Sequence, residues 1–398
     1  MTVRGPETAW YVVRIPVQET ECLSLGVTLA QDCEGSALGG LEARFHRYAF
    51  WMRQVWVGDL VGDTFRQLRF NSPAGGWFPV LHRFYWCITE SNLPYMDLFL
   101  SQYLKEVTIT PSRSWVASGV PRNIVPAIAS TISALPVSAL QSLRVGYGVA
   151  WVDLKDSLSS VALRCGPSLT VFSSPIPLSG AAVNHLIQLP NLCLWRLNGC
   201  PPNYSTLPSP PTFPPLTKFV LWGGATRGWL SLLELLLGSV PSTQGVTPLS
   251  RIKESLMSLE FEDSDFTINS SFTSTIRIFR NLRSLFVELG CRDGGYQGLC
   301  PFDLDDENVT KFAMAMPQLE HLFLGRPCSK NTCATTVACL LAISVYCLKL
   351  EELEVHFNTT NIVEDQQHLS GPPIPNSTIA SEVFSRVFGC LATTTHRR

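Results

Sequence analysis

The sequence is poor in charge. Of its 398 residues only 16% are Asp, Glu, Lys or Arg, against about 25% in a typical soluble domain. Lys and Arg number 30, Asp and Glu number 32, and the net charge is −2. Such a chain produces no broad positive field, so we expect neither nucleic acid nor a membrane surface as a partner. Hydrophobic residues make up 45% of the chain, which indicates a large folded core rather than disorder.

Segments for export or membrane insertion are also lacking. The N-terminal residues contain no continuous apolar region of the kind found in a secretory signal. The stretch 229–240, WLSLLELLLGSV, contains Glu234 and is shorter than the roughly 20 residues that span a bilayer. The 13 cysteines include no CxxC pair, and reduced thiols are typical of intracellular proteins. We therefore predict a cytoplasmic or nuclear protein with reduced cysteines and no metal site.

Recognisable active-site motifs are missing as well. No G-x-S-x-G, Walker, H-E-x-x-H or G-x-G-x-x-G sequence occurs. The glycines of 223–228 could form a phosphate loop, but they lack a Lys-Ser/Thr pair, and a strand exit is the favoured interpretation. Asp303, Asp305, Asp306 and Glu307 do not follow the spacing of a calcium loop and fit the acidic first turn of a helix better. We predict no catalytic residue and no cofactor.

What the sequence does contain is a repeat. The pattern is Leu, two residues, apolar, one residue, apolar, and it is often preceded by Pro, as in LPNLCLWRL (189–197), FPPLTKFVL (213–221) and MPQLEHLFL (316–324). We number the places of each repeat from its first residue, the anchor. Ten intervals separate the anchors; they run from 23 to 40 residues. The anchors are Met52, Leu81, Leu104, Leu140, Leu169, Leu192, Leu216, Leu256, Leu282, Leu319 and Leu350.

Each repeat reads as one strand followed by a helix or loop. Apolar residues at the fourth and sixth places alternate with polar ones, as in a half-buried strand. Helical patterns follow in 122–135, 179–189, 305–316 and 335–346. Stacked units of this kind share one continuous core. The sequence therefore predicts an α/β leucine-rich-repeat solenoid of about eleven irregular repeats, with a curved parallel sheet inside and helices and irregular loops outside. An ordinary α/β sheet is the alternative.

The segments RFHRYAFWMRQVWV (44–57), FPVLHRFYW (78–86) and LPYMDLFLSQYLKEVTI (93–109) resemble fungal F-box proteins with a leucine-rich-repeat tail. The resemblance covers residues 44–360 and implies the substrate-binding arm of an SCF-type ubiquitin ligase, with a Skp-type adaptor on the F-box. Residues 1–43 occupy the F-box position, but its Leu-Pro opening is matched only poorly by Ile15-Pro16. We expect the solenoid to span 44–360 and a Pro-containing loop and capping helix to occupy 361–398, the helix itself being 378–391.

In this register the third, fifth and seventh places face the concave side, where exposed aromatic and charged side chains are typical of a protein-binding surface. The first half, which looks basic, contributes Gln54, Trp56, Arg83, Tyr85, Arg144, Arg196, Asn198, Lys218 and Trp222. The second half, which looks acidic, contributes Glu260, Glu262, Phe286, Glu288, His321, Phe323, Glu352, Glu354 and His356. We expect a bipolar groove for a protein partner; the alternative is that these charges only keep the sheet soluble.

Two other interpretations stay open. The Pro-rich stretch 199–215 fits a loop between repeats better than a polyproline ligand, and 240–249, 290–301 and 361–377 read as similar insertions.

For the whole chain, the leading hypothesis is a non-enzymatic recognition module. The alternatives are a hydrolase-like α/β enzyme without a known motif and a leucine-rich-repeat scaffold unconnected to ubiquitin.

Overall fold

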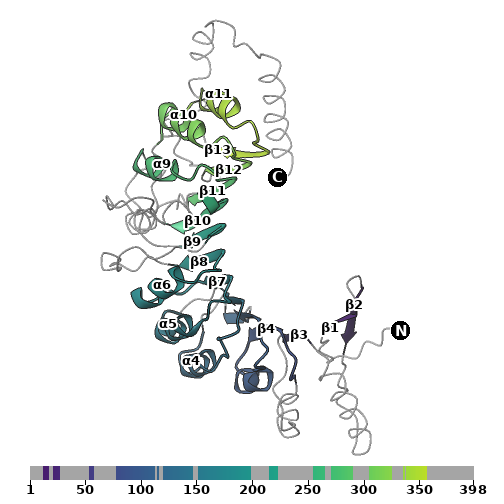
Figure 1. The fold of residues 1–398 in the computed structure, drawn as a ribbon. Coiled ribbons are helices and arrows are strands. Elements are labelled where there is room, and N and C mark those ends of the chain that lie inside the picture. Colours follow the sequence, from purple (N-terminus) through teal and green to yellow (C-terminus); the bar gives the residue numbers. More distant parts are fainter. Residues whose placement is uncertain are drawn as a thin grey trace, which may run out of the picture. The chain divides into compact units, whose positions relative to one another are not determined.

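The computed structural model of the chain describes thirteen segments, drawn in colour in Figure 1. They are residues 12–17, 21–26, 53–57, 78–112, 114–115, 120–146, 151–198, 215–222, 254–264, 270–289, 304–324, 335–336 and 338–355. The chain divides into two compact units, Met1–Leu194 and Trp195–Arg398. The predictions for loops 199–214, 240–249, 290–301 and 361–377, the glycines of 223–228 and the helix 378–391 lie outside the described residues.

Eleven strands form one sheet and follow one another in chain order (Figure 1). They are β3 (Gln54–Val57), β4 (Arg83–Ile88), β5 (Glu106–Pro111), β6 (Ser142–Val145), β7 (Val171–Ser174), β8 (Leu194–Asn198), β9 (Lys218–Trp222), β10 (Ser258–Ser264), β11 (Ser284–Leu289), β12 (His321–Leu324) and β13 (Glu352–Val355). The sheet is parallel, and each of its strands begins two residues after a predicted anchor. A separate antiparallel pair joins β1 (Val12–Val17) to β2 (Glu21–Gly26).

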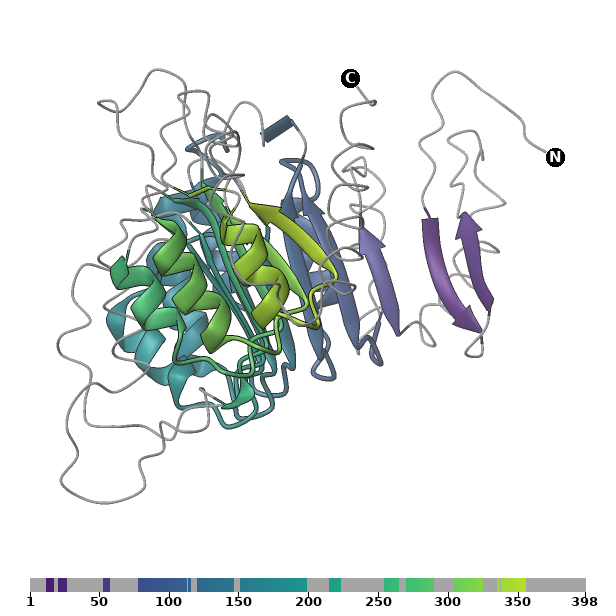
Figure 2. The same ribbon diagram turned by 90° about the horizontal axis from the view of Figure 1, so that it is seen from above.

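The helices lie on one side of the strands in each unit (Figure 2). The first unit has the 3-10 helices η1 (Leu93–Phe99) and η2 (Trp151–Leu154) and the α-helices α4 (Val125–Ser133), α5 (Lys155–Arg164) and α6 (Gly180–Ile187). The second has α9 (Ser270–Ile276), α10 (Asp306–Ala315) and α11 (Ala338–Tyr346). In the first unit α5 packs between α4 and α6, and in the second α10 packs between α9 and α11. The fold class predicted from the repeats is therefore confirmed, as are the four predicted helices.

A turn before eight of the anchors explains why Pro so often precedes the strand. The backbone N–H of the anchor donates to the carbonyl three residues earlier, as in Leu192 to Leu189 and Leu319 to Met316. Pro190 and Pro317 then occupy the second position of a four-residue turn, where the fixed φ of proline fits. The third residue of the turn reaches the preceding repeat: the Asn191 amide donates to the carbonyl of Pro167 at 2.8 Å.

Backbone hydrogen bonds fix the register between repeats. The carbonyl at the second place accepts N–H groups from both the second and the third place of the following repeat. His82 and Arg83 donate to Arg53 in this way, each at 2.9 Å, and Glu320 and His321 donate to Arg283 at 2.7 and 2.9 Å. Equivalent places consequently stand side by side: Leu285 pairs with Leu322, and Leu322 with Leu353. In each of these strand pairs, the third place of one repeat lies opposite the third place of the next.

The core lies between the sheet and the helices. The leucine anchors from Leu81 to Leu319 are at most 1% exposed, and residues at the fourth and sixth places, such as Phe84 and Trp86, are buried with them. In β13 the fourth- and sixth-place residues Leu353 and Val355 are only half-buried, because this strand ends the sheet and has a single neighbour.

Polar contacts join each helix to its neighbour. Arg164 at the end of α5 donates to the Ser133 carbonyl at the end of α4 at 2.6 Å. The Nε2 atom of His185 in α6 lies 2.9 Å from the Cys165 carbonyl after α5. These contacts satisfy carbonyl groups that a helix leaves without an intrahelical partner, and they hold adjacent repeats together on the helix side as the sheet does on the other.

Candidate partner-binding face of the sheet

The face of the sheet opposite the helices carries the third and fifth places of the repeats. In the first unit the third places form the cross-strand row Gln54, Arg83, Glu106, Ser142 and Val171. The fifth places form the neighbouring row Trp56, Tyr85, Thr108, Arg144 and Ser173. The structure places Gln54 and Arg83 in the first row and Tyr85 and Arg144 in the second. Of Trp56 only the backbone is described.

The first unit is less basic than the sequence suggested. The guanidinium of Arg83 donates to the carboxylate of Glu106 at 2.9 Å, so one of the predicted cations has its own counter-ion. Glu106 was missing from the predicted set although it occupies a third place, in YLKEVTI (103–109); applying the register to every repeat would have found it. Arg144 is exposed and makes no ion pair with a described residue.

A second group of basic side chains lies at the start of these strands. Arg53, His82 and Lys105 hold the second place of successive repeats, and their backbones are hydrogen-bonded to one another. Burial lowers the pKa of His82, and the nearby charges of Lys105, Arg53 and Arg83 lower it further. The repeat pattern does not single out this group, because Arg53, His82 and Lys105 come from separate repeats.

In the second unit the third places form the row Lys218, Ser258, Ser284, His321 and Glu352. The fifth places form the row Val220, Glu260, Phe286, Phe323 and Glu354. The ammonium of Lys218 lies 2.5 Å from the carboxylate of Glu260, diagonally across β9 and β10. His321 Nδ1 lies 3.3 Å from Glu352 Oε2 but without hydrogen-bond geometry. At second places, Arg283 Nη1 lies 3.4 Å from Glu320 Oε1.

Two aromatic side chains stack at the centre of the fifth-place row. The ring centroids of Phe286 and Phe323 are 4.3 Å apart and the ring planes differ by 19°. Both side chains are half-buried, so the pair keeps accessible surface on the face that carries the charges. Aromatic pairs of this kind add to the energy of area burial and are enriched at protein interfaces.

The structure describes the remaining predicted residues only in part. Arg196 lies in β8 and is half-buried, and Glu288 lies half-buried in β11. Glu262 pairs with Trp222 of β9, whereas toward β11 the register shifts between Phe261 and Ser264. The side chains of Asn198, Trp222 and Glu262 and all of His356 lie outside the described residues.

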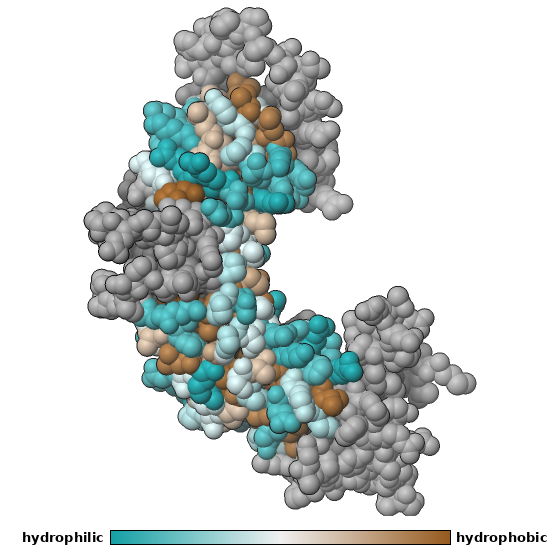
Figure 3. Space-filling view, in the orientation of Figure 1, coloured by the Kyte–Doolittle hydropathy of each residue, from teal (hydrophilic) through white to brown (hydrophobic). Residues whose placement is uncertain are grey.

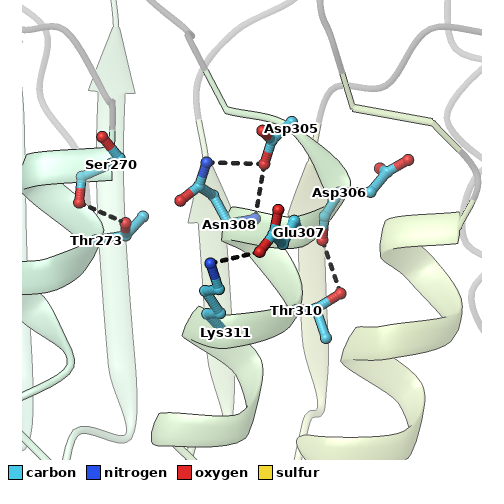
Figure 4. Close-up of polar contacts among 8 residues, drawn as sticks. All are labelled: Ser270, Thr273, Asp305, Asp306, Glu307, Asn308, Thr310 and Lys311. Carbon is cyan, nitrogen blue, oxygen red and sulfur yellow. Dashed lines mark hydrogen bonds and ion pairs between the residues drawn. The ribbon is translucent and has the colours of Figure 1, made fainter.

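Asp305, just before α10, and Asp306 and Glu307, in its first turn, form a helix start, as predicted (Figure 4). A carboxylate oxygen of Asp305 accepts from the Asn308 backbone N–H and side-chain amide, each at 2.7 Å. Glu307 pairs with Lys311 one turn later at 2.6 Å. Asp303 lies outside the described residues. Within the described part of the chain, no group of three or more His, Cys, Asp or Glu side chains could hold a metal ion.

Cys165 and Cys347 are buried cysteines with free thiols. Burial raises the pKa of Cys165 to about 12 and that of Cys347 to about 11. Both thiols are therefore almost entirely protonated at neutral pH and act as small hydrophobic core residues.

Hydrophobic surface also appears on the helix side, over α11 (Figure 3). Val345 and Leu348 are 47% and 75% exposed there. No described helix is long and apolar enough to cross a membrane.

Taken together, the repeated turn, the aligned strands and the helices along one side define a leucine-rich-repeat type of architecture. No protein-family model matches the chain, and no curated protein matches it. Among solved structures, the leucine-rich-repeat-containing protein LegL7 from Legionella pneumophila is similar over 76% of this chain and 92% of its own, with 12% sequence identity and a TM-score of 0.34. The sheet and its repeats define the architecture.

Proposed function

We propose that this chain is a non-enzymatic recognition module that binds a protein partner on the exposed face of its sheet. The observation that carries the proposal is the difference between the two faces. One face is covered by helices, and its residues, such as Leu285 and Leu322, are 1% exposed. The other presents Arg144, the Phe286–Phe323 pair and Glu354 in regular rows, a mixture of aromatic and charged groups that suits protein interfaces.

The test is a pair of charge-reversal variants with the same change in net charge. Glu352→Lys with Glu354→Lys changes the exposed sheet face, where both side chains are exposed. Glu254→Lys with Glu307→Lys changes two exposed carboxylates elsewhere, Glu307 being on the helix side. Partners are identified by cross-linking to the unchanged chain, purified, and titrated against all three proteins by calorimetry. We expect the sheet-face variant to lose at least one partner that the other variant keeps. Equal binding by both variants would contradict the proposal.

The resemblance to F-box proteins supports a narrower role, in which this chain is the substrate-binding arm of an SCF-type ubiquitin ligase. Adaptor binding in that family belongs to a helical module. Here the described residues of the 1–43 segment are the strands β1 and β2, which include the Ile15-Pro16 pair. The direct test is gel filtration of the full chain with a purified Skp-type adaptor. Co-elution supports the ligase role; separate elution removes that role and leaves the recognition proposal standing.

A further inference from the structure

The order of residues in the fifth-place row of the second unit indicates which kind of partner side chain binds there. Across β10 to β13 the row reads Glu260, Phe286, Phe323 and Glu354, each residue directly opposite the next. Two stacked phenyl rings therefore stand between two carboxylates. The outer side of each ring in the row is next to a glutamate, at the spacing of neighbouring strands, about 4.8 Å.

The two ends of this row differ in their charge balance. At one end Glu260 is bound by the ammonium of Lys218 at 2.5 Å, and the Glu260 side chain is only 19% exposed. At the other end Glu354 is exposed and pairs with no cation among the described residues. Its neighbour Glu352 is 81% exposed and lies 3.3 Å from His321, which carries a charge only when protonated. Lys218 of the third-place row therefore neutralises Glu260, whereas no cation among the described residues neutralises Glu354.

We propose that an arginine side chain of the protein partner binds at the Glu354 end, with its guanidinium against the ring of Phe323 and its N–H groups on Glu354 and Glu352. This inference rests on the recognition function proposed above and names the chemistry of one contact. A planar guanidinium can stack on an aromatic ring and donate in its own plane to carboxylates at the same time. An ammonium provides the charge without the planar fork, so arginine is favoured over lysine.

The probe is a fluorescein-labelled peptide of alternating glycine and arginine, compared with its lysine counterpart by fluorescence anisotropy at fixed salt. The unchanged protein should bind the arginine peptide more tightly than the lysine peptide. Glu354→Gln should weaken arginine-peptide binding about 5- to 10-fold, because it removes a charge-assisted hydrogen bond. Phe323→Leu should weaken it about 2- to 5-fold through loss of the cation–π contact.

Two matched variants separate the site from a general acidic field. Glu351→Gln removes the same charge from an exposed second-place residue in the same repeat and should change affinity less than about 2-fold, the size expected of a surface charge outside the contact. Phe323→Tyr keeps the aromatic face and should retain the affinity that Phe323→Leu loses. Circular dichroism confirms that each variant is folded.

The proposal is overturned if Glu351→Gln weakens binding as much as Glu354→Gln, if Phe323→Tyr and Phe323→Leu behave alike, or if the unchanged protein does not prefer the arginine peptide. These outcomes are distinct from failure of the recognition function. A cross-linked partner lost by the Glu352→Lys and Glu354→Lys variant, together with no arginine preference, would remove only the arginine contact and leave the sheet face as the binding surface.

Discussion

Asp306 and Thr336 join two repeats on the helix side of the second unit. One carboxylate oxygen of Asp306, in the first turn of α10, accepts the backbone N–H of Thr336 at 2.7 Å, and the other accepts its hydroxyl at 2.6 Å. Thr336 precedes α11, and its hydroxyl accepts the backbone N–H of Ala338 at 3.2 Å. A single acidic side chain thus organises the start of the following helix.

Replacing Asp306 should therefore destabilise the second unit. Asp306→Ala removes the acceptor of two hydrogen bonds and leaves a part-buried N–H without its partner, at a cost of about 1–3 kcal/mol. Urea unfolding followed by circular dichroism measures this loss in the free energy of unfolding. Glu307→Ala is the matched control, because Glu307 is 73% exposed and its surface ion pair is worth about 0.5 kcal/mol or less. Equal losses in the two variants would show that the Asp306 contact adds nothing.

In the first unit, the side chain of Asn92 is a fully buried polar group. Its side-chain oxygen accepts from the Trp86 indole at 2.8 Å and from the Thr89 backbone N–H at 2.9 Å, and its amide donates to the Cys87 carbonyl at 2.9 Å. Asn92→Ala leaves these groups unsatisfied, and we expect a loss of about 2–4 kcal/mol, since each orphaned buried group costs about 1–3 kcal/mol. Urea unfolding measures the loss, with exposed Ser91→Ala as the control; a loss below 1 kcal/mol (roughly the value of one ordinary hydrogen bond) would contradict this account.

The turn before Leu350 offers a stabilising substitution. It has the hydrogen bond of the other turns, from Leu350 to the Cys347 carbonyl at 3.1 Å, but Leu348 stands where Pro190 and Pro317 stand in theirs. Leu348→Pro should raise the free energy of unfolding by about 0.4–1 kcal/mol by restricting the unfolded chain. Lys349→Pro, one position later, should lower it, because proline is disfavoured at the third position of such a turn. Thermal unfolding of both variants checks the order.

Native Cys165 and Cys347 should resist alkylation. With pKa values of about 12 and 11, their thiolate fractions at pH 8 are on the order of one in ten thousand and one in a thousand, and the thiolate is the reactive form. Iodoacetamide labelling followed by peptide mass spectrometry should leave both unmodified in the folded protein and modify both in urea. Labelling of the folded protein at the rate seen in urea would contradict their burial.

The same two thiols predict how stability depends on alkaline pH. Unfolding returns their pKa values to about 9, so above that pH the unfolded chain loses protons that the folded chain keeps. The free energy of unfolding should then fall as pH rises from 9 towards 11, by at most about 1.4 kcal/mol per pH unit for each thiol. The variant with Cys165→Ala and Cys347→Ala should show a shallower fall in urea unfolding across this range; parallel curves would contradict the assignment.

The repeat could be predicted from the sequence because its signal is local. An anchor such as Leu319 brings its own turn proline, Pro317, and its own alternating strand, and buried and exposed faces follow from a period of two. Since all repeats share one turn and one pattern of backbone hydrogen bonds, their places also align across the sheet. The sequence alone therefore determined the strands, their parallel order and the alignment of repeat places across the sheet, as well as the helix start at Asp305.

Only the tertiary structure decided how those side chains pair. Arg83 with Glu106, Lys218 with Glu260, and Phe286 with Phe323 are 23, 42 and 37 residues apart in the chain, and each contact depends on side-chain torsions that the repeat pattern does not specify. The Lys218–Glu260 pair runs diagonally rather than along its row, so alignment of places does not predict it. These pairings determine which charges are neutralised and leave Glu354 beside Phe323 without a cation among the described residues, because long side chains satisfy the nearest opposite charge that their rotamers reach.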